Sequence, residues 1–393
     1  MISRFALACS ACSTPITARI QIGHEERQRL SAVCPACFAP FSMTLDLSHP
    51  PHIIPVLIDG CRVEEDNNEA AIVANLGTGY VISRGRLHDD AYFPVFDMPE
   101  PTKDELAAFG DARLIDLTVA LGGLPDAQGK WRLVRNAYRH ARLGRFELCQ
   151  QTLSTLYPDE KLPEIPIEAA IVTFLTRTLH PCGMPRMEKL LSDISAVRTQ
   201  FPNEFERLRL HFQAQRDDRL DDYMEVFQHF FRAYDEFNQT LIYVRRGIDL
   251  PEDPYAPSSD FDNTKLYYGE AFESLGAGLD FAIALNNVAS GRAFDKLRNI
   301  SLQEYRRSDK GRRGEAIRDS DVFEVFVEEY DNQLRNASHH RWLRLSDDRS
   351  EITYRIGGTG ERRSLSYATY LLRCDRITMS LMLLASLELL VLH

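Results

Sequence analysis

A run of ten residues, Asp331–His340, gathers side chains suited to acid–base chemistry on a phosphate: Arg335, Asn336, His339 and His340. Imidazole exchanges a proton near neutral pH, and a guanidinium carries a permanent charge that can hold phosphate oxygens. RNA can be cut without a metal when its own 2′-hydroxyl attacks the adjacent phosphorus. That reaction needs a general base, a general acid and positive charge on the transition state. These residue types therefore favour phosphodiester chemistry.

Each side chain in the run has an expected role. Arg335 would stabilise the transition-state charge, His340 would transfer protons, and Asn336 would position a reacting group. His339 is the rival of His340, because residues four apart on a helix share a face. Residues five apart point about 140° from each other on a straight helix. Either the helix ends near Ser338, or the active cleft is composite.

The arrangement Arg335-Asn336…His340 resembles the motif of HEPN domains, which are all-α units found in many RNA-cutting toxins and defence proteins. The family's spacing allows four to six residues between the arginine and the histidine, and His340 meets it. The resemblance covers about residues 217–392. It implies a four-helix bundle in which the motif closes the third helix and a short β excursion precedes the last one. It also implies a homodimer or higher homo-oligomer with two motifs facing a shared cleft.

The resemblance further implies a metal-independent endoribonuclease that acts as a toxin or as an abortive-infection effector against phage. RNA would be its substrate, and a regulatory protein or nucleic acid is a possible further partner. The motif is a short string, however, and an exposed helix end with polar residues is ordinary. The alternative is a noncatalytic nucleic-acid- or protein-binding assembly module with a dimerising bundle.

The spacing of apolar residues predicts the helices of this bundle. Spacings of three and four predict one long amphipathic helix from Leu220 to Val244, ended by Gly247. The run Val322–Tyr330 is expected to be helical and to enter a core. Three more helices and a small hairpin complete the expectation: Lys265–Ala289, Asp319–His340, Ser364–Leu392 and the hairpin at Ile352–Gly360.

A basic segment precedes the motif. Residues 292–318 hold nine lysines and arginines against four acids, a surplus of five positive charges. Such a local surplus can collect phosphates even when the whole chain is acidic. A solvated loop is the alternative. The candidate RNA-binding residues are Arg306, Arg307, Lys310, Arg312 and Arg313.

Two C-x2-C pairs stand near the N-terminus, separated by 21 residues: Cys9, Cys12, Cys34 and Cys37. Four thiolates in a tetrahedron are what structural zinc prefers, and alternating apolar residues around both pairs predict short strands. The pattern is typical of a zinc ribbon, with unpaired thiols or a redox pair as alternatives. Four cysteine ligands leave no open position, so the Zn²⁺ would be structural and would stabilise a module too small to fold alone. What the ribbon binds stays open.

The composition sets the frame. The chain has 393 residues, 44% of them hydrophobic, and this length suggests two or three domains. Its net charge of −11 argues against nonspecific coating of nucleic acid. The fold class expected is mainly α. Its expected segments are 1–50 (zinc ribbon), 51–103 (small β-containing linker), 104–214 (helical middle region) and 215–393 (HEPN-like bundle).

The middle region is expected to hold short helices at Leu106–Leu121, 165–179, 186–199 and 203–214, with a helical hairpin at Lys130–Leu156. The hairpin resembles a single tetratricopeptide-type unit, and its role stays open. The N-terminus is too short in apolar residues for a secretory signal, and Ile377–Leu392 falls short of a membrane span. These features predict a cytoplasmic protein whose cysteines are thiols or metal ligands.

Overall fold

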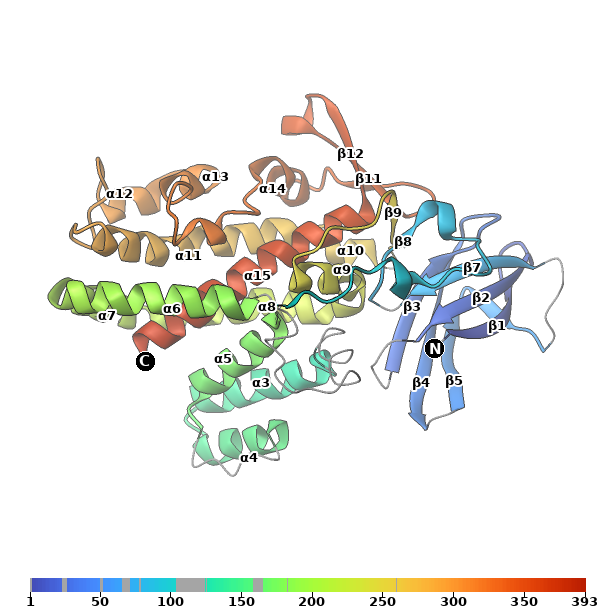
Figure 1. The fold of residues 1–393 in the computed structure, drawn as a ribbon, viewed down its shortest axis with the longest axis horizontal. Coiled ribbons are helices and arrows are strands. Elements are labelled where there is room, and N and C mark those ends of the chain that lie inside the picture. The colour runs from blue at the N-terminus through green and yellow to red at the C-terminus, as the bar shows by residue number, and fades with distance from the viewer. Residues whose placement is uncertain are drawn as a thin grey trace. The chain divides into compact units, whose positions relative to one another are not determined.

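The structure is a computed structural model that describes residues 2–22, 27–49, 52–65, 71–77, 79–103, 124, 126–157, 165–181, 183–258 and 260–393. The fold is mainly α with a small N-terminal β region, as the sequence predicts (Figure 1). The helix expected at Leu106–Leu121 lies outside the described residues. Contacts divide the chain into two units, each built from three separate stretches. The first unit is Met1–Asp126, Ala233–Leu266 and Asn336–Asp375, and the second is Ala127–Arg232, Tyr267–Arg335 and Arg376–His393.

The N-terminal part of the first unit contains two small sheets. One has the strand order β6-β1-β2-β7, in which β2 and β7 run parallel and the other neighbours antiparallel. The other is the antiparallel sheet β3-β4-β5. Leu7, Ile20, Leu30 and Met43 belong to one buried core cluster, because alternate residues of a strand face the same side. The strands are β1 (Ile2–Cys9), β2 (Pro15–Gln21), β3 (Arg27–Val33), β4 (Pro40–His49), β5 (His52–Asp59), β6 (Cys61–Val63) and β7 (Ile72–Gly77).

The rest of the first unit combines short helices with two further sheets. The helix α9 ends where Gly247 adopts a φ of 64°, a left-handed conformation that glycine takes without strain. The predicted C-terminal hairpin is confirmed and gains a third strand, giving the order β10-β11-β12. The elements are η1 (Arg84–Arg86), η2 (Pro94–Asp97), β8 (Ile82–Ser83), β9 (Pro254–Tyr255), α9 (Tyr234–Arg246), α10 (Phe261–Thr264), β10 (Arg344–Leu345), β11 (Glu351–Arg355), η5 (Ile356–Gly358) and β12 (Arg362–Ser366).

The second unit is helical around aromatic side chains. Trp131 is 1% exposed and stacks on Phe231 with 4.9 Å between ring centroids. The hairpin predicted at Lys130–Leu156 is confirmed as α3 and α4. The elements of the second unit are α3 (Ala127–Arg142), α4 (Phe146–Leu156), α5 (Ile167–Leu179), α6 (Gly183–Gln200), α7 (Pro202–Gln213), α8 (Arg216–Arg232), α11 (Tyr267–Ala289), α12 (Leu302–Arg307), α13 (Lys310–Arg313), η3 (Gly314–Ala316) and η4 (Glu324–Phe326).

Two helices cross the boundary between the units, α14 (Asn332–His339) and α15 (Tyr367–Leu392). The helix predicted at Ser364–Leu392 is therefore confirmed except for its first three residues, which belong to β12. Within the part of the chain that is described, no helix is both long and apolar enough to cross a membrane.

The single helix predicted from Leu220 to Val244 is wrong. α8 ends at Arg232, Ala233 leaves the helical conformation with φ −100° and ψ 22°, and α9 begins at Tyr234. The Ala233 carbonyl accepts the Glu236 N–H at 3.0 Å and so starts a new helix. Acidic residues in the first turn of α9 favour this start, because the end of a helix that carries free N–H groups attracts negative charge.

The helix predicted at Asp319–His340 is also wrong over its first part. Val322–Tyr330 forms turns with one 3₁₀ turn, η4, although its apolar side chains are largely buried as expected. β-branched and aromatic residues lose side-chain freedom in a helix, so this run has little preference for one. Asp331 then caps α14, because its Oδ1 accepts the backbone N–H of Gln333 at 2.7 Å and of Leu334 at 3.2 Å.

Candidate metal centre and candidate nucleic-acid site

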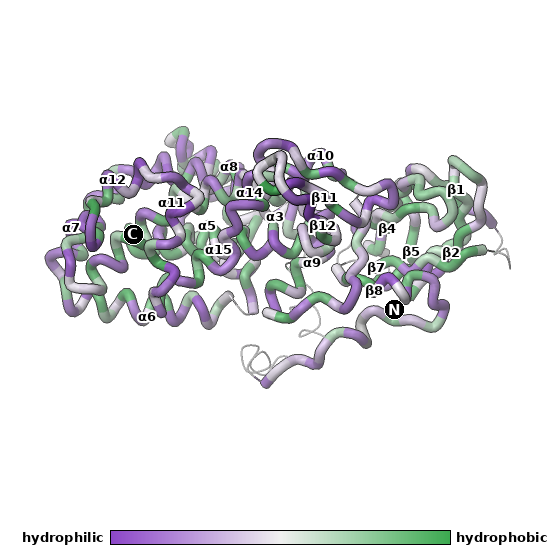
Figure 2. The backbone as a smooth tube through the Cα atoms, turned by 90° about the horizontal axis from the view of Figure 1, so that it is seen from above, coloured by the Kyte–Doolittle hydropathy of each residue, from purple (hydrophilic) through white to green (hydrophobic). Residues whose placement is uncertain are grey.

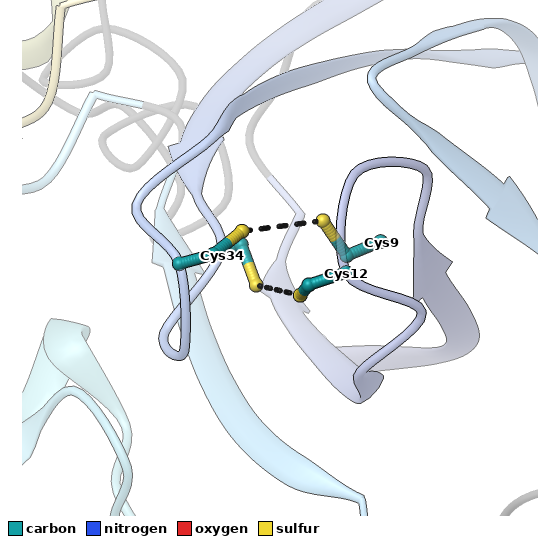
Figure 3. Close-up of side chains that lie close together, drawn as sticks. Cys9, Cys12 and Cys34 are labelled. Carbon is teal, nitrogen blue, oxygen red and sulfur yellow. Dashed lines mark hydrogen bonds between the residues drawn. The ribbon is translucent and has the colours of Figure 1, made fainter.

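The four N-terminal cysteines come together. Their sulfur atoms all lie within 4.8 Å of one another, with 3.7 Å between Cys9 and Cys37 and 3.6 Å between Cys12 and Cys34. Figure 3 shows the Cys9, Cys12 and Cys34 side chains directed toward a common centre. Cys9 and Cys34 are buried, whereas Cys12 and Cys37 are exposed.

The two cysteine pairs sit on equivalent turns. Cys9 ends β1 and Cys34 follows β3, and each carbonyl accepts the N–H of the residue four positions later, Ser13 or Phe38, at 2.9 Å. Ser13 and Phe38 both have a positive φ, 60° and 58°. The backbone therefore folds each C-x2-C segment into the same tight knuckle, which turns both sulfur atoms of a pair to one side.

The cysteine cluster fits a tetrahedral metal ion. With zinc–sulfur bonds of about 2.3 Å, the sulfur atoms of a regular tetrahedron lie about 3.8 Å apart. The Cys9–Cys37 and Cys12–Cys34 separations, 3.7 and 3.6 Å, are close to that edge. The backbone N–H of Ala11 lies 3.4 Å from the Cys9 sulfur and can stabilise a thiolate there. The four residues thus form a possible metal-binding site compatible with zinc.

The thiols of the cluster differ in acidity. Burial raises the pKa of Cys34 to about 12, and a hydrogen bond with the Thr14 side chain lowers the pKa of Cys12 to about 6. The sequence alone could not predict this difference, because it depends on which thiol is buried and which one contacts Thr14.

Arg335 lies in a charged cluster of the second unit. Its Nε donates to Glu273 at 2.6 Å, its Nη2 donates to the same carboxylate, and Lys310 lies 2.8 Å from the other Glu273 oxygen. Burial raises the pKa of Glu273, but the two cations outweigh it and hold the pKa below its ordinary value. The Arg335 guanidinium also lies over the Phe272 ring at 5.9 Å, and its side chain is 21% exposed.

The other residues of the motif belong to the first unit. His339 and His340 are exposed, Asn336 is half-buried, and Ser338 is buried with its hydroxyl donating to the Lys265 carbonyl at 2.7 Å. α14 ends at His339, as one of the two sequence alternatives required. The unit boundary falls between Arg335 and Asn336.

The basic segment divides into paired and exposed residues. Arg313 is 8% exposed and donates to the backbone carbonyls of Gly276, Arg306 and Ser308, while Arg306 pairs with Asp280 at 2.6 Å. Lys310 pairs with Glu273 as described above. Arg307 and Arg312 are exposed, and Arg312 lies 3.6 Å from the exposed Glu315. The tube of α12, which contains Arg307, is largely hydrophilic (Figure 2). Asp280 and Glu273, which pair with Arg306 and Lys310, lie on α11, and a count of local charge could not reveal these partners.

A pocket that the sequence analysis did not single out lies in the first unit, directly after α14. Its volume is about 440 Å³, and its lining includes Trp342, Thr353 and four arginines. The signal that could have found it is the density of arginines around the predicted hairpin, six between residues 341 and 363. The pocket is lined by Arg341, Trp342, Arg344, Thr353, Tyr354, Arg355 and Arg362.

Comparison with protein-family models, with curated protein sequences and with solved structures gives no match to this chain.

Proposed function

We propose that this chain is a metal-independent endoribonuclease of the HEPN type, active as a homodimer. The observation that carries the proposal is the end of α14, where two exposed histidines follow Arg335 by four and five residues. Exposed imidazoles can reach a substrate and exchange protons near neutral pH. A function as a toxin or an anti-phage effector belongs to the same proposal, because it follows from the resemblance to HEPN proteins.

The proposed reaction needs only side chains and the RNA. One imidazole takes the proton of the 2′-hydroxyl, and the resulting oxygen attacks the adjacent phosphorus. The bond from phosphorus to the 5′-oxygen breaks, and that oxygen receives a proton. The products are a 2′,3′-cyclic phosphate and a 5′-hydroxyl. A guanidinium at the phosphorane, Arg335 in this proposal, stabilises the negative charge that develops there.

Histidines from two chains would supply the acid and the base together. A single motif offers His340 with Asn336 for positioning, and His339 as the rival base. A second copy of the chain across a shared cleft would add a second imidazole, so that one histidine acts as the base and the other as the acid. Sedimentation equilibrium tests this part of the proposal, because a monomer that cuts RNA at full rate would contradict it.

In this proposal the cysteine cluster binds structural Zn²⁺ as a zinc ribbon. Four thiolates would fill the coordination sphere, so the ion would hold the two knuckles together and leave no position for a substrate. Its contribution would be to the stability of the N-terminal β region.

The pairing of Arg335 with Glu273 favours a second candidate, a noncatalytic binding and assembly module. A partly buried guanidinium that already shares a carboxylate with Lys310 is suited to holding the second unit together. In that case the arginine would be structural, and RNA or a protein would bind without being cut.

A cleavage assay with labelled single-stranded RNA separates the two candidates. The wild type is incubated with a chelator, and the zinc content of the same sample is measured so that loss of the structural ion is not mistaken for loss of a catalytic one. We expect His340→Ala to lower the rate by about 10²–10⁴-fold and Arg335→Ala by about 10²–10³-fold.

The matched controls are Arg186→Ala, which removes an exposed surface ion pair with Glu328, and His393→Ala at the exposed C-terminus. Both controls should cut RNA as the wild type does. Equal cutting by the wild type and by both motif variants would refute the nuclease. Binding without cutting by folded wild type would support the second candidate.

A further inference from the structure

The pocket after α14 is built on one face of the sheet β10-β11-β12. Register places Arg344 opposite Thr353, and Arg355 opposite Arg362. Residues two apart on a strand share a face, so Thr353 and Arg355 lie on the same side as their partners. The burial of β11 agrees, because Ile352 is buried while its neighbours are not. Three strands thus place three guanidinium groups on one face.

This face carries positive charge around Arg355 and Arg362, and Glu351 lies on the same face at the other end of β11. Like charges directly opposite each other on antiparallel strands are destabilising, and Arg355 faces Arg362 in this way. Across the described ranges, none of the four arginines that line the pocket forms an ion pair. Arg355 donates to the Gly360 carbonyl at 3.2 Å and Arg362 to the Thr353 hydroxyl at 3.4 Å, which are both neutral acceptors. An anion bound here would relieve the repulsion.

An aromatic pair stands beside these charges. Trp342 lines the pocket, and the His340 ring stacks on it with 4.8 Å between centroids and 27° between planes. The turn after α14 is held in place because the backbone N–H of Trp342 donates to the Ala337 carbonyl at 2.9 Å. Arg341, between the two rings, has a φ of 57°, a conformation that an arginine adopts at a cost. The chain therefore folds back sharply after α14 and brings a half-buried indole to the arginine-rich face.

We infer that this pocket binds one nucleotide of a single-stranded RNA, with its base against Trp342 and its phosphate between Arg355 and Arg362. Unpaired bases stack on aromatic rings and on guanidinium planes, whereas guanidinium groups clamp phosphate oxygens. A volume of about 440 Å³ lies within the usual range of small-ligand sites, about 300–1,000 Å³. An acidic peptide would use the charges but not the indole.

The inference rests on the proposed function and deepens it. His340 is the proposed proton-transfer group and touches the ring that would hold the base. A nucleotide seated in the pocket would therefore place the RNA strand beside the imidazole. Neither the basic segment at 292–318 nor the cysteine cluster has a role in this step.

Tryptophan fluorescence measures binding directly. The chain has two tryptophans, and Trp131 is 1% exposed, so quenching by an RNA strand reports on Trp342. The titration uses a short oligouridylate and the full chain carrying Arg335→Ala, which should slow cutting by about 10²–10³-fold. We expect saturable quenching in this variant. Trp342→Phe should remove the signal while binding persists by anisotropy of a labelled strand.

The arginine variants decide the inference. Combined Arg355→Ala and Arg362→Ala should weaken binding by about tenfold or more and lower the log–log salt slope by about 1, because one phosphate loses its clamp. The matched control is Arg363→Ala, which removes an exposed arginine that neighbours Arg362 but does not line the pocket. Trp342→Ala should weaken binding by about five- to a hundredfold. Unchanged affinity in the folded double variant would overturn the inference.

Competition tests the chemical class of the ligand. If polyglutamate displaces the labelled strand as effectively as unlabelled RNA does, the base contributes nothing to binding and its proposed role is overturned. Uridine monophosphate that binds as tightly as the strand would overturn the strand as the ligand. Weak displacement by both competitors would support the inference.

The outcomes separate this inference from the proposed function. If the wild type cuts RNA and the double variant binds and cuts equally well, the pocket is refuted and the nuclease stands. If the double variant loses binding but the wild type never cuts, the nuclease is refuted and the pocket stands.

Discussion

Replacing Arg219 should destabilise the second unit more than any surface ion pair does. Its side chain is 12% exposed and contacts two carboxylates that are almost fully buried, Glu388 at 3% and Asp280 at 5%. Its Nε lies 2.5 Å from Glu388 and its Nη1 lies 2.8 Å from Asp280. The guanidinium also lies over the Phe212 ring at 5.2 Å. Its removal therefore leaves charge in a region from which water is excluded.

The size of the stability loss follows from the contacts that each carboxylate retains after Arg219 is replaced. Asp280 retains Arg306 at 2.6 Å, but Glu388 retains only the Tyr223 hydroxyl at 2.9 Å among the contacts described. Breaking one side of a buried ion pair costs about 3–5 kcal/mol, because the remaining charge is buried without compensation. Arg219→Met should therefore lower the free energy of unfolding by about 3–5 kcal/mol.

Urea unfolding followed by far-ultraviolet circular dichroism measures the loss. The matched control is Arg142→Ala, whose side chain is 38% exposed and pairs with the exposed Asp217 and Asp221, and it should cost about 1 kcal/mol or less. Adding Glu388→Gln to Arg219→Met should recover stability. A loss no larger than that of Arg142→Ala would refute the reasoning.

Three further predictions concern other features. Cys34→Ser should abolish the binding of one zinc ion per chain, measured by mass spectrometry of the metal, whereas Cys149→Ala, outside the cluster, should keep it; zinc retained at full occupancy in Cys34→Ser would contradict the site. Burial raises the pKa of Asp375, whose Oδ1 has no hydrogen-bond partner among the described residues. The folded protein therefore favours the protonated acid, and its stability falls as the pH rises above the pKa of about 3.9 that Asp375 has in the unfolded chain. Asp375→Asn should therefore raise the melting temperature at neutral pH and give less benefit near pH 4; an equal shift at both pH values would contradict this. Gly276→Ala should lower the free energy of unfolding by about 1 kcal/mol, because the new Cβ would meet the Tyr330 hydroxyl at 2.5 Å, whereas Gly85→Ala meets nothing within 4 Å and should not; a gain in stability for Gly276→Ala would show that Tyr330 moves freely.

Local patterns predicted local structure well. Period-two apolarity gave the strands around the cysteines, and the C-x2-C spacing placed four sulfur atoms in one cluster. The amphipathic helix α3 belongs to the predicted hairpin, and the predicted helix Lys265–Ala289 is α11, which begins at Tyr267. The strands and helices depend on residues a few positions apart, which the sequence shows directly, and the cysteine cluster follows from a known ligand spacing.

Breaks within helices and contacts between residues far apart in the chain could not be predicted from local sequence patterns. The break at Ala233 keeps the apolar spacing on both sides, so periodicity alone extends across it. Val322–Tyr330 is buried as its composition indicates, but burial does not distinguish a helix from turns. The two units draw on three stretches each, and the sequential segments proposed from composition stay a prediction.

The candidate site shows the same limit. The motif residues were found by type and spacing, but the partner of Arg335 is Glu273, 62 positions away in the chain. Arg306 and Arg313 count as positive charge in the sequence, yet the fold directs them to Asp280 and to backbone carbonyls. The pocket arginines are dispersed over 22 residues and meet only through strand register.

The ends of the RNA products test the central claim most directly. Wild-type protein that has been purified with its zinc content verified is incubated with single-stranded RNA in a chelator, and the termini are analysed by mass spectrometry. The account predicts 2′,3′-cyclic phosphate and 5′-hydroxyl ends, which disappear together in His340→Ala. Intact RNA, or 5′-phosphate ends that form only after Mg²⁺ is added, would contradict it.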